Sequence, residues 1–221
     1  MNKILIILIL ILNSFLAFSQ ANNEEQNIYN AVLEYYFLKY HNDSTKTILL
    51  IDSTKTIDDK SLNAIIEITR KFYDGNFYSY YHDYLDVDTS DINNIEKLNR
   101  NFHLRSLEIA ELSDLSGKYK NISFVKKSYL DSIFHPYRSI NSYNNRDSVA
   151  NVLKNCWFKL TSDMNCLGYC SLSRPYIIDH NKALIYFSFM QGSMAGMSAV
   201  YILKKESNIW KVKRIITIGV S

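Results

Sequence analysis

The three cysteines are the residues whose chemistry the sequence constrains most. Cys156, Cys166 and Cys170 are an odd set, so an oxidised chain forms at most one internal disulfide and keeps one free thiol. Cys166 and Cys170 flank Leu167-Gly168-Tyr169, which we interpret as a loop that brings their α-carbons within the bridging distance of about 4.4 to 6.8 Å. This spacing predicts a Cys166–Cys170 disulfide, although spacing alone leaves other pairings open.

Other catalytic and metal-binding chemistry finds little support. A structural zinc site needs four ligands at characteristic spacings, and the five histidines are dispersed along the chain. A catalytic cysteine with His135 or His180 as its base is the alternative, but no neighbouring residue indicates an activated thiolate. The serine of Gly192–Gly196 stands second in its segment and not at the centre, so the segment is a hairpin loop and not a nucleophile elbow. No catalytic residue, metal or cofactor is predicted.

A polar segment from Phe77 to Asn101 carries four aspartates among tyrosines. Calcium takes six to eight oxygen ligands, so these acids raise the alternative of a calcium site, but their spacing does not match an EF-hand loop. Runs of Asp and Asn more often mark solvated turns or helix caps. The tyrosines suit half-buried packing, with a sugar-stacking surface as the other interpretation. The aspartates are Asp83, Asp86, Asp88 and Asp91.

The start of the chain predicts export. Lys3 precedes the aliphatic run Ile4–Leu12, and Ala17-Phe18-Ser19 supplies the small residues of a cleavage site, as in a signal peptide. The run is shorter than the roughly 20 apolar residues of a membrane-spanning helix. We therefore predict a signal peptide over residues 1–19 and an exported protein, periplasmic or extracellular, with no stable membrane span after cleavage. An uncleaved anchor is the alternative.

Composition indicates one ordered domain over residues 20–221. The chain has 221 residues, a formal net charge of +3, 17 Tyr, 6 Gly and 2 Pro, which suits a packed domain better than a linker. Basic residues are scattered, and the densest group, Lys211, Lys213 and Arg214, alternates along a predicted strand. Because nucleic-acid sites need a basic face, no nucleic-acid partner is predicted.

Apolar spacing predicts helices and isolated strands before residue 160. Helical periodicity is clearest at Asn22–Tyr40 and Ser148–Leu160, and β-branched residues mark a strand at Thr45–Ile51. The remaining predictions are a helix that begins at Asp58-Asp59 and ends near Phe72, a strand or short helix at Ile122–Ile133, and a loop at His135–Arg146.

The last fifty residues predict four strands joined by short turns. We expect an antiparallel meander, and the fold class is α+β, with this sheet packed against N-terminal helices and with Ala31–Tyr40 covering one face. The strands are Leu172–Ile178, Ala183–Phe189, Met197–Lys205 and Ile209–Ile218.

This C-terminal region resembles small exported proteins of unknown function that are common in Bacteroidota. The similar segments are Leu172–Pro175, Ala183–Tyr186, Gly192–Gly196, Tyr201–Lys205 and Trp210–Val212. The resemblance implies α+β packing and no particular activity.

The sequence favours a non-enzymatic module that binds a small molecule or an envelope protein. We expect its site in a cleft between the C-terminal sheet and the helices, where Tyr186, Tyr201 and Trp210 are candidate lining residues; the same aromatics could equally be core. Arg174 is a candidate buried cation, with Glu34 as a partner. A hydrolase with an unrecognised site and an envelope structural protein are the alternatives.

Overall fold

The structure, a computed structural model, describes residues 23–37, 46–71, 92–112, 115, 119, 121–139, 146–192 and 195–220. The predicted signal peptide and the aspartates at 83, 86, 88 and 91 lie outside these residues, so both remain predictions. Within the described part of the chain, no helix has the length and apolar character needed to cross a membrane.

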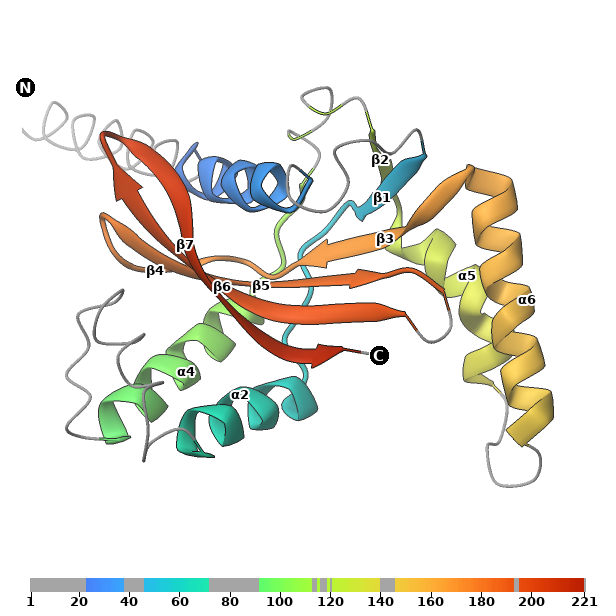
Figure 1. The fold of residues 1–221 in the computed structure, drawn as a ribbon, viewed down its shortest axis with the longest axis horizontal. Coiled ribbons are helices and arrows are strands. Elements are labelled where there is room, and N and C mark those ends of the chain that lie inside the picture. The colour runs from blue at the N-terminus through green and yellow to red at the C-terminus, as the bar shows by residue number, and fades with distance from the viewer. Residues whose placement is uncertain are drawn as a thin grey trace, which may run out of the picture.

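Seven strands of the described residues form one mixed sheet (Figure 1). Their order is β2-β1-β3-β5-β6-β7, and β4 pairs with the first part of β5. β1 runs parallel to both β2 and β3, and the other pairings are antiparallel. The strands are β1 (Thr47–Ile51), β2 (Ile122–Val125), β3 (Cys166–Leu172), β4 (Tyr176–Asp179), β5 (Lys182–Met190), β6 (Gly196–Glu206) and β7 (Ile209–Val220).

The predicted α+β class is confirmed, and the predicted meander is matched only in part. β4, β5, β6 and β7 pair antiparallel in sequence order, but β5 also pairs with β3, and the parallel strands β1 and β2 extend the same sheet. The single strand expected at Leu172–Ile178 is wrong, because the chain leaves the sheet between β3 and β4. Pro175, which has no N–H to donate to a strand partner, lies in this break.

Two helix pairs and one N-terminal helix pack on the sheet. The N-terminal helix covers residues 23–37, and the pairs are α2 (Asp59–Lys71) with α4 (Ile92–Ser106) and α5 (Lys127–Arg138) with α6 (Arg146–Met164). Asp58 caps α2, since its carboxylate accepts a hydrogen bond of 2.7 Å from the Ser61 N–H. The loop predicted from His135 is corrected at its start, because α5 continues through Pro136 to Arg138.

The N-terminal helix lies on the opposite face of the sheet from α2 and α4 (Figure 1). It contributes Ile28, Val32 and Tyr36 to a core that we call the N-terminal cluster, together with Ile185 and Phe187 of β5. The prediction that a helix from this region covers one face of the sheet therefore agrees with the structure.

The other face of the sheet carries two separate core clusters. The α2–α4 cluster includes Ile65, Leu98, Phe102, Leu184, Tyr186 and Val200. The α5–α6 cluster includes Leu130, Phe134, Trp157, Leu160 and Cys166, with Tyr169 and Met190 packed against it. On β5, side chains that share a face alternate, so Ser188 lies between Tyr186 of one cluster and Met190 of the other.

Candidate functional site

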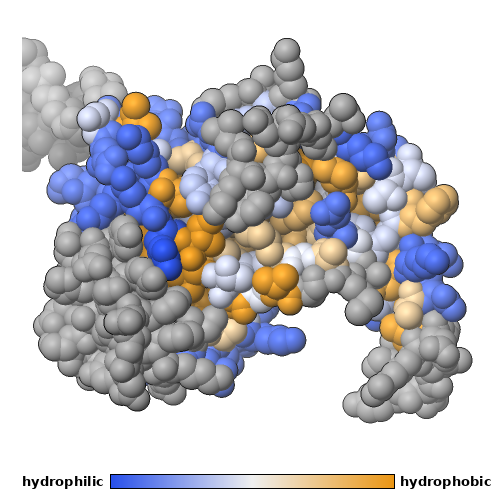
Figure 2. Space-filling model, viewed as in Figure 1, coloured by the Kyte–Doolittle hydropathy of each residue, from blue (hydrophilic) through white to orange (hydrophobic). Residues whose placement is uncertain are grey.

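A cleft of about 500 Å³ lies between the two helix-covered regions of this face. Its walls are α5 and the segment of residues 51–58 that leads from β1 to α2, and its floor is formed by β3, β5 and β6. In Figure 2 the outline of the molecule is indented between the α2–α4 pair and the α5–α6 pair, so the two pairs do not meet over the centre of the sheet.

Three serines form a row across the floor, which we call the serine row. Ser171 of β3 is opposite Ser188 of β5, and Ser188 is opposite Ser198 of β6. The hydroxyl oxygens of Ser171 and Ser188 lie 2.7 Å apart and are hydrogen-bonded. Serine side chains are small, and the β7 partner of Ser198 is Gly219, so short side chains here leave the space that the cleft occupies.

Aromatic side chains flank the serine row on both sides. Tyr186 borders it towards the α2–α4 cluster, and Tyr169 borders it towards the α5–α6 cluster. The Tyr169 ring is stacked on Trp157, with centroids 5.6 Å apart and an angle of 10° between the planes, and Phe134 packs edge-on against Trp157. Burial raises the pKa of the Tyr169 hydroxyl, so this tyrosine stays neutral at physiological pH.

The wall segment between β1 and α2 is held by backbone hydrogen bonds to three other parts of the chain. The Thr54 N–H donates to Ala110 O at 2.8 Å, and the Lys55 N–H donates to Leu172 O at 2.7 Å. The Ile57 N–H donates to the Ser106 hydroxyl at 3.1 Å. These bonds fix Lys55 and its neighbours beside the floor before any ligand arrives.

Charged side chains of both signs line the cleft. Arg138 and Asp131 of α5 form an ion pair of 2.6 Å, and the Asp58 carboxylate is occupied by capping α2. The Lys55 ammonium lies over the Tyr186 ring, 5.5 Å from its centroid. Neither Lys55 nor Lys127 forms an ion pair with another residue in the described part of the chain. Lys55 is near enough to Asp58 to help lower the pKa of that carboxyl, but neither lysine is neutralised by a direct contact within the described lining.

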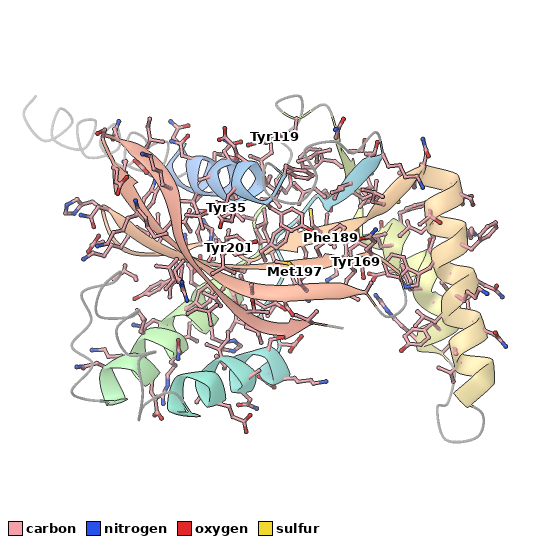
Figure 3. All side chains as sticks on the ribbon, viewed as in Figure 1. Tyr35, Tyr119, Tyr169, Phe189, Met197 and Tyr201 are labelled. Atoms are coloured by element: carbon pink, nitrogen blue, oxygen red, sulfur yellow. The ribbon has the colours of Figure 1, made fainter. Side chains whose placement is uncertain are left out.

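Of the three predicted lining residues, only Tyr186 reaches this cleft. Tyr201 and Trp210 belong to the N-terminal cluster on the other face. Figure 3 shows Tyr201 and Tyr35 together beneath the N-terminal helix, and their rings meet edge-on at 6.2 Å. The Trp210 indole N–H donates to Glu24 at 2.6 Å. Tyr201 and Trp210 therefore hold the N-terminal helix on the sheet, and for them the core interpretation is the better one.

The predicted Cys166–Cys170 disulfide is not supported, because all three cysteines are free thiols. Residues 166–172 form β3 and not a loop, and a strand places residues four apart at about 13 Å, beyond bridging distance. Cys166 packs in the α5–α6 cluster, whereas Cys170 packs in the N-terminal cluster on the other face. Burial raises the pKa of Cys170 to about 12 and raises that of Cys166 as well, which argues against an activated thiolate in either residue.

Arg174 is a partly buried cation with acidic partners, as predicted, but its first partner is not Glu34. Arg174 Nε lies 3.0 Å from Glu25 Oε2, and its Nη1 lies 2.9 Å from Glu108. Arg105 also contacts Glu25, at 2.6 Å. Glu25 lies about two and a half helical turns before Glu34 and is buried, whereas Glu34 is exposed. Through the buried Glu25 carboxylate, Arg174 ties the N-terminal helix to the β3–β4 break, and Arg105 ties it to the end of α4.

The serine row could not be found from the sequence. Ser171, Ser188 and Ser198 are separated by 17 and 10 positions along the chain, and only the strand register brings them into line. A local signal exists at Ser188 alone, as the one polar residue in the apolar run of β5 between Ala183 and Met190. Among the described residues, no group of His, Cys, Asp and Glu is arranged to hold a metal ion.

Comparisons of the chain with protein-family models, with curated proteins and with solved structures found no match in any of the three.

Proposed function

We propose that this protein is a non-enzymatic binding module that holds a small molecule in the cleft over the serine row. The observation that carries the proposal is the interruption of one sheet face, where Ser188 separates two apolar clusters and leaves a cavity of about 500 Å³. Small-molecule sites are typically concavities of about 300 to 1,000 Å³ with apolar walls and a few placed polar groups. The cleft has these features.

The lining of the cleft favours binding over hydrolysis. Its described residues offer hydroxyls, two lysines, one arginine and two aspartates, and none of them is His, Cys or Glu. A serine nucleophile needs a base within hydrogen-bond reach, whereas the recorded side-chain partner of Ser188 is another serine. The hydrolase alternative would need a lysine or aspartate of the lining to come within hydrogen-bond reach of a serine hydroxyl.

Export is part of the same proposal. The predicted signal peptide, and the resemblance of the C-terminal strands to small exported Bacteroidota proteins, both support a periplasmic or extracellular module. Intact mass of the protein recovered from the native host tests this point, since retention of residues 1–19 would contradict cleavage.

The test of cleft binding is a thermal-shift screen against chemically diverse small molecules, repeated on variants whose cleft is filled. A ligand at 100 times its Kd stabilises the fold by about 2.7 kcal/mol. Ser198→Phe places a ring over the floor, and Thr56→Trp fills the space from the wall, so either variant should lose the shift. Ser162→Phe, on the exposed side of α6, is the control and should keep it. A shift that survives both filled variants would place the ligand elsewhere.

A partner-binding role is the second candidate, and one observation favours it. Leu104, Leu107 and Ile109 lie at and just beyond the end of α4 and are exposed by 54%, 48% and 58%. Exposed apolar residues that gather in one region often mark protein interfaces. Leu104→Ser together with Leu107→Ser would weaken capture of a partner without changing a small-molecule shift, because neither residue lines the cleft.

A further inference from the structure

We propose, on the basis of the function proposed above, that the cleft over the serine row binds an anionic, polyhydroxylated small molecule of the sugar-acid type. Its hydroxyls would lie on the serine row and its acidic group towards Lys55 and Lys127. Three features of the lining carry this assignment: the line of hydroxyls, the aromatic borders and the two lysines.

The serine row provides hydrogen-bonding groups at regular steps. Adjacent strands are about 4.8 Å apart, so Ser171, Ser188 and Ser198 cover about 10 Å across three strands. A hydroxyl can donate one hydrogen bond and accept two, and the Ser171–Ser188 bond uses one donor of the two. The pair therefore keeps one O–H donor and several acceptor positions. Ser198 shares the cleft floor with them.

Hydroxyls that both donate and accept suit a ligand that does the same. Ser53 and Thr56 add two further hydroxyls from the wall segment. A ligand with many hydroxyl groups can pair with such a surface in either direction. An apolar ligand would instead leave the remaining O–H of the Ser171–Ser188 pair and the neighbouring hydroxyls without a partner, at a cost of about 1 to 3 kcal/mol for each buried group. The floor thus selects against a purely apolar ligand.

The aromatic borders fit a molecule that also has apolar surface. Tyr169 and Tyr186 stand on opposite sides of the serine row, and Phe134 and Leu130 of α5 complete the apolar part of the wall. The Tyr169 ring is held in place by its stacking on Trp157, so it offers a rigid surface. The C–H faces of a sugar ring are apolar while its edges are polar, which matches apolar walls beside a hydroxyl floor.

The two lysines supply the preference for an acid. Lys55 and Lys127 both line the cleft and form no ion pair within the described residues, whereas Arg138 is paired with Asp131 and Asp58 caps α2. The Lys127 N–H lies 3.3 Å from the Asp52 carboxylate, which fixes the first residue of α5 close to the end of β1. An acidic group that reaches either ammonium would gain charge-assisted hydrogen bonds from it.

The experiment compares four probes on the full mature chain by isothermal titration calorimetry and thermal shift. They are D-glucuronate, its neutral counterpart D-glucose, digalacturonate, and octanoate as an apolar anion. We expect a uronate to bind, D-glucose to bind at least tenfold more weakly, and octanoate not to bind. Raising the salt concentration should raise the Kd for the uronate, because salt screens the attraction between exposed charges.

Matched variants test each part of the assignment. Lys127→Gln and Lys55→Gln should each raise the uronate Kd by about tenfold, the loss expected for one hydrogen bond to a charged group, and leave D-glucose binding within twofold. Ser198→Ala should weaken both sugars alike. Lys159→Gln, on the exposed side of α6, is the control and should change neither.

The outcomes separate the ligand class from the proposed function. If octanoate or a neutral compound binds best and Ser198→Phe abolishes its binding, the cleft is a binding site but the anionic polyhydroxy class is wrong. If a uronate binds with a Kd that Ser198→Phe and Thr56→Trp both leave unchanged, the proposed site is wrong. If neither these probes nor the diverse screen shifts the melting temperature, both proposals are overturned.

Discussion

The hydroxyl oxygens of Ser171 and Ser188 lie 2.7 Å apart on neighbouring strands, in the floor of a cleft and between two apolar clusters. Both residues are buried, and each hydroxyl has the other as its hydrogen-bond partner. This pair is polar where a sheet of this kind would normally continue its core.

A double-mutant cycle measures what this pair contributes to stability. Ser171→Ala or Ser188→Ala alone should lower the free energy of unfolding by about 1 to 2 kcal/mol, because the remaining hydroxyl loses its partner. The double variant should cost less than the sum of the two, with a coupling energy of about 1 kcal/mol. Urea unfolding of the four proteins gives these values. Additive losses would show that the two hydroxyls do not interact.

Glu25 should be the most important acid for holding the N-terminal helix. Glu25→Gln removes the charge that faces both Arg105 and Arg174, and we expect it to lower the free energy of unfolding by about 1.5 to 3 kcal/mol. Glu34→Gln, in the same helix but exposed, is the matched control and should change stability by less than about 0.5 kcal/mol. Both are measured by urea unfolding, and equal effects would contradict the role of Glu25.

Glu24 should make stability depend on pH on the acidic side. Burial alone would raise the pKa of Glu24, but the hydrogen bonds from Lys205 and Trp210 outweigh burial and hold the pKa below its ordinary value of 4.5. A carboxyl with a lowered folded pKa contributes stability that is fully present above the unfolded pKa and is lost as the pH falls through the folded pKa.

The melting temperature of the wild type should therefore fall more steeply than that of Glu24→Gln as the pH is lowered from about 6 towards 3. Glu24→Gln should also be less stable at neutral pH. Asp163→Asn, an exposed change on α6, should keep the wild-type slope. Parallel curves for wild type and Glu24→Gln would mean that Lys205 and Trp210 do not stabilise the charged form.

Gly168 should not tolerate a side chain. A Cβ at this position would lie 2.0 Å from the carbonyl oxygen of Met190, which is backbone and cannot move aside cheaply. Gly168→Ala should therefore cost about 1 to 3 kcal/mol through overpacking. Gly219→Ala is the control, because its Cβ would meet Ser198 Oγ at an ordinary 3.6 Å. Chemical denaturation of both variants measures these losses. Equal losses of unfolding free energy for Gly168→Ala and Gly219→Ala would contradict the close packing at Gly168.

The cysteines should behave as three buried thiols. A thiol reagent such as 5,5′-dithiobis(2-nitrobenzoate) should react slowly with the native protein and should titrate all 3 cysteines of the chain after unfolding. Reductant should leave the melting temperature unchanged. If only one thiol reacted in the unfolded, unreduced protein, two of the cysteines would have to be joined in a disulfide.

The C-terminal strands could be predicted because their apolar runs and turns are local. The residue types at Asp179–Lys182 and Glu206–Asn208 are typical of turns. Ser207 and Asn208 adopt the positive φ angles of 48° and 67° that a two-residue hairpin favours. The break at Ser173–Pro175 is different. It depends on Arg174 reaching Glu25, which lies 149 positions away in the sequence.

Two elements were missed for physical reasons that the sequence does not display. β3 is buried on both faces, so Cys166, Gly168 and Cys170 show no alternation with polar residues and suggested a loop. α4 is largely polar and buries few apolar side chains, among them Leu98 and Phe102. The cleft could be expected between sheet and helices, and Tyr186 could be named, but its floor depends on a register that no local pattern reveals.

The separation of the α2–α4 cluster from the α5–α6 cluster has a consequence for how the molecule opens. Because the two clusters are separate among the residues that the structure describes, each helix pair can leave the sheet as its own cooperative unit while the N-terminal cluster keeps the strands together. Amide hydrogen exchange would then show two sets of helix protons with different opening free energies. A ligand that contacts both walls would make the two helix pairs open together, with one shared opening free energy. Hydrogen exchange would then detect binding as a change in cooperativity even where no backbone moves.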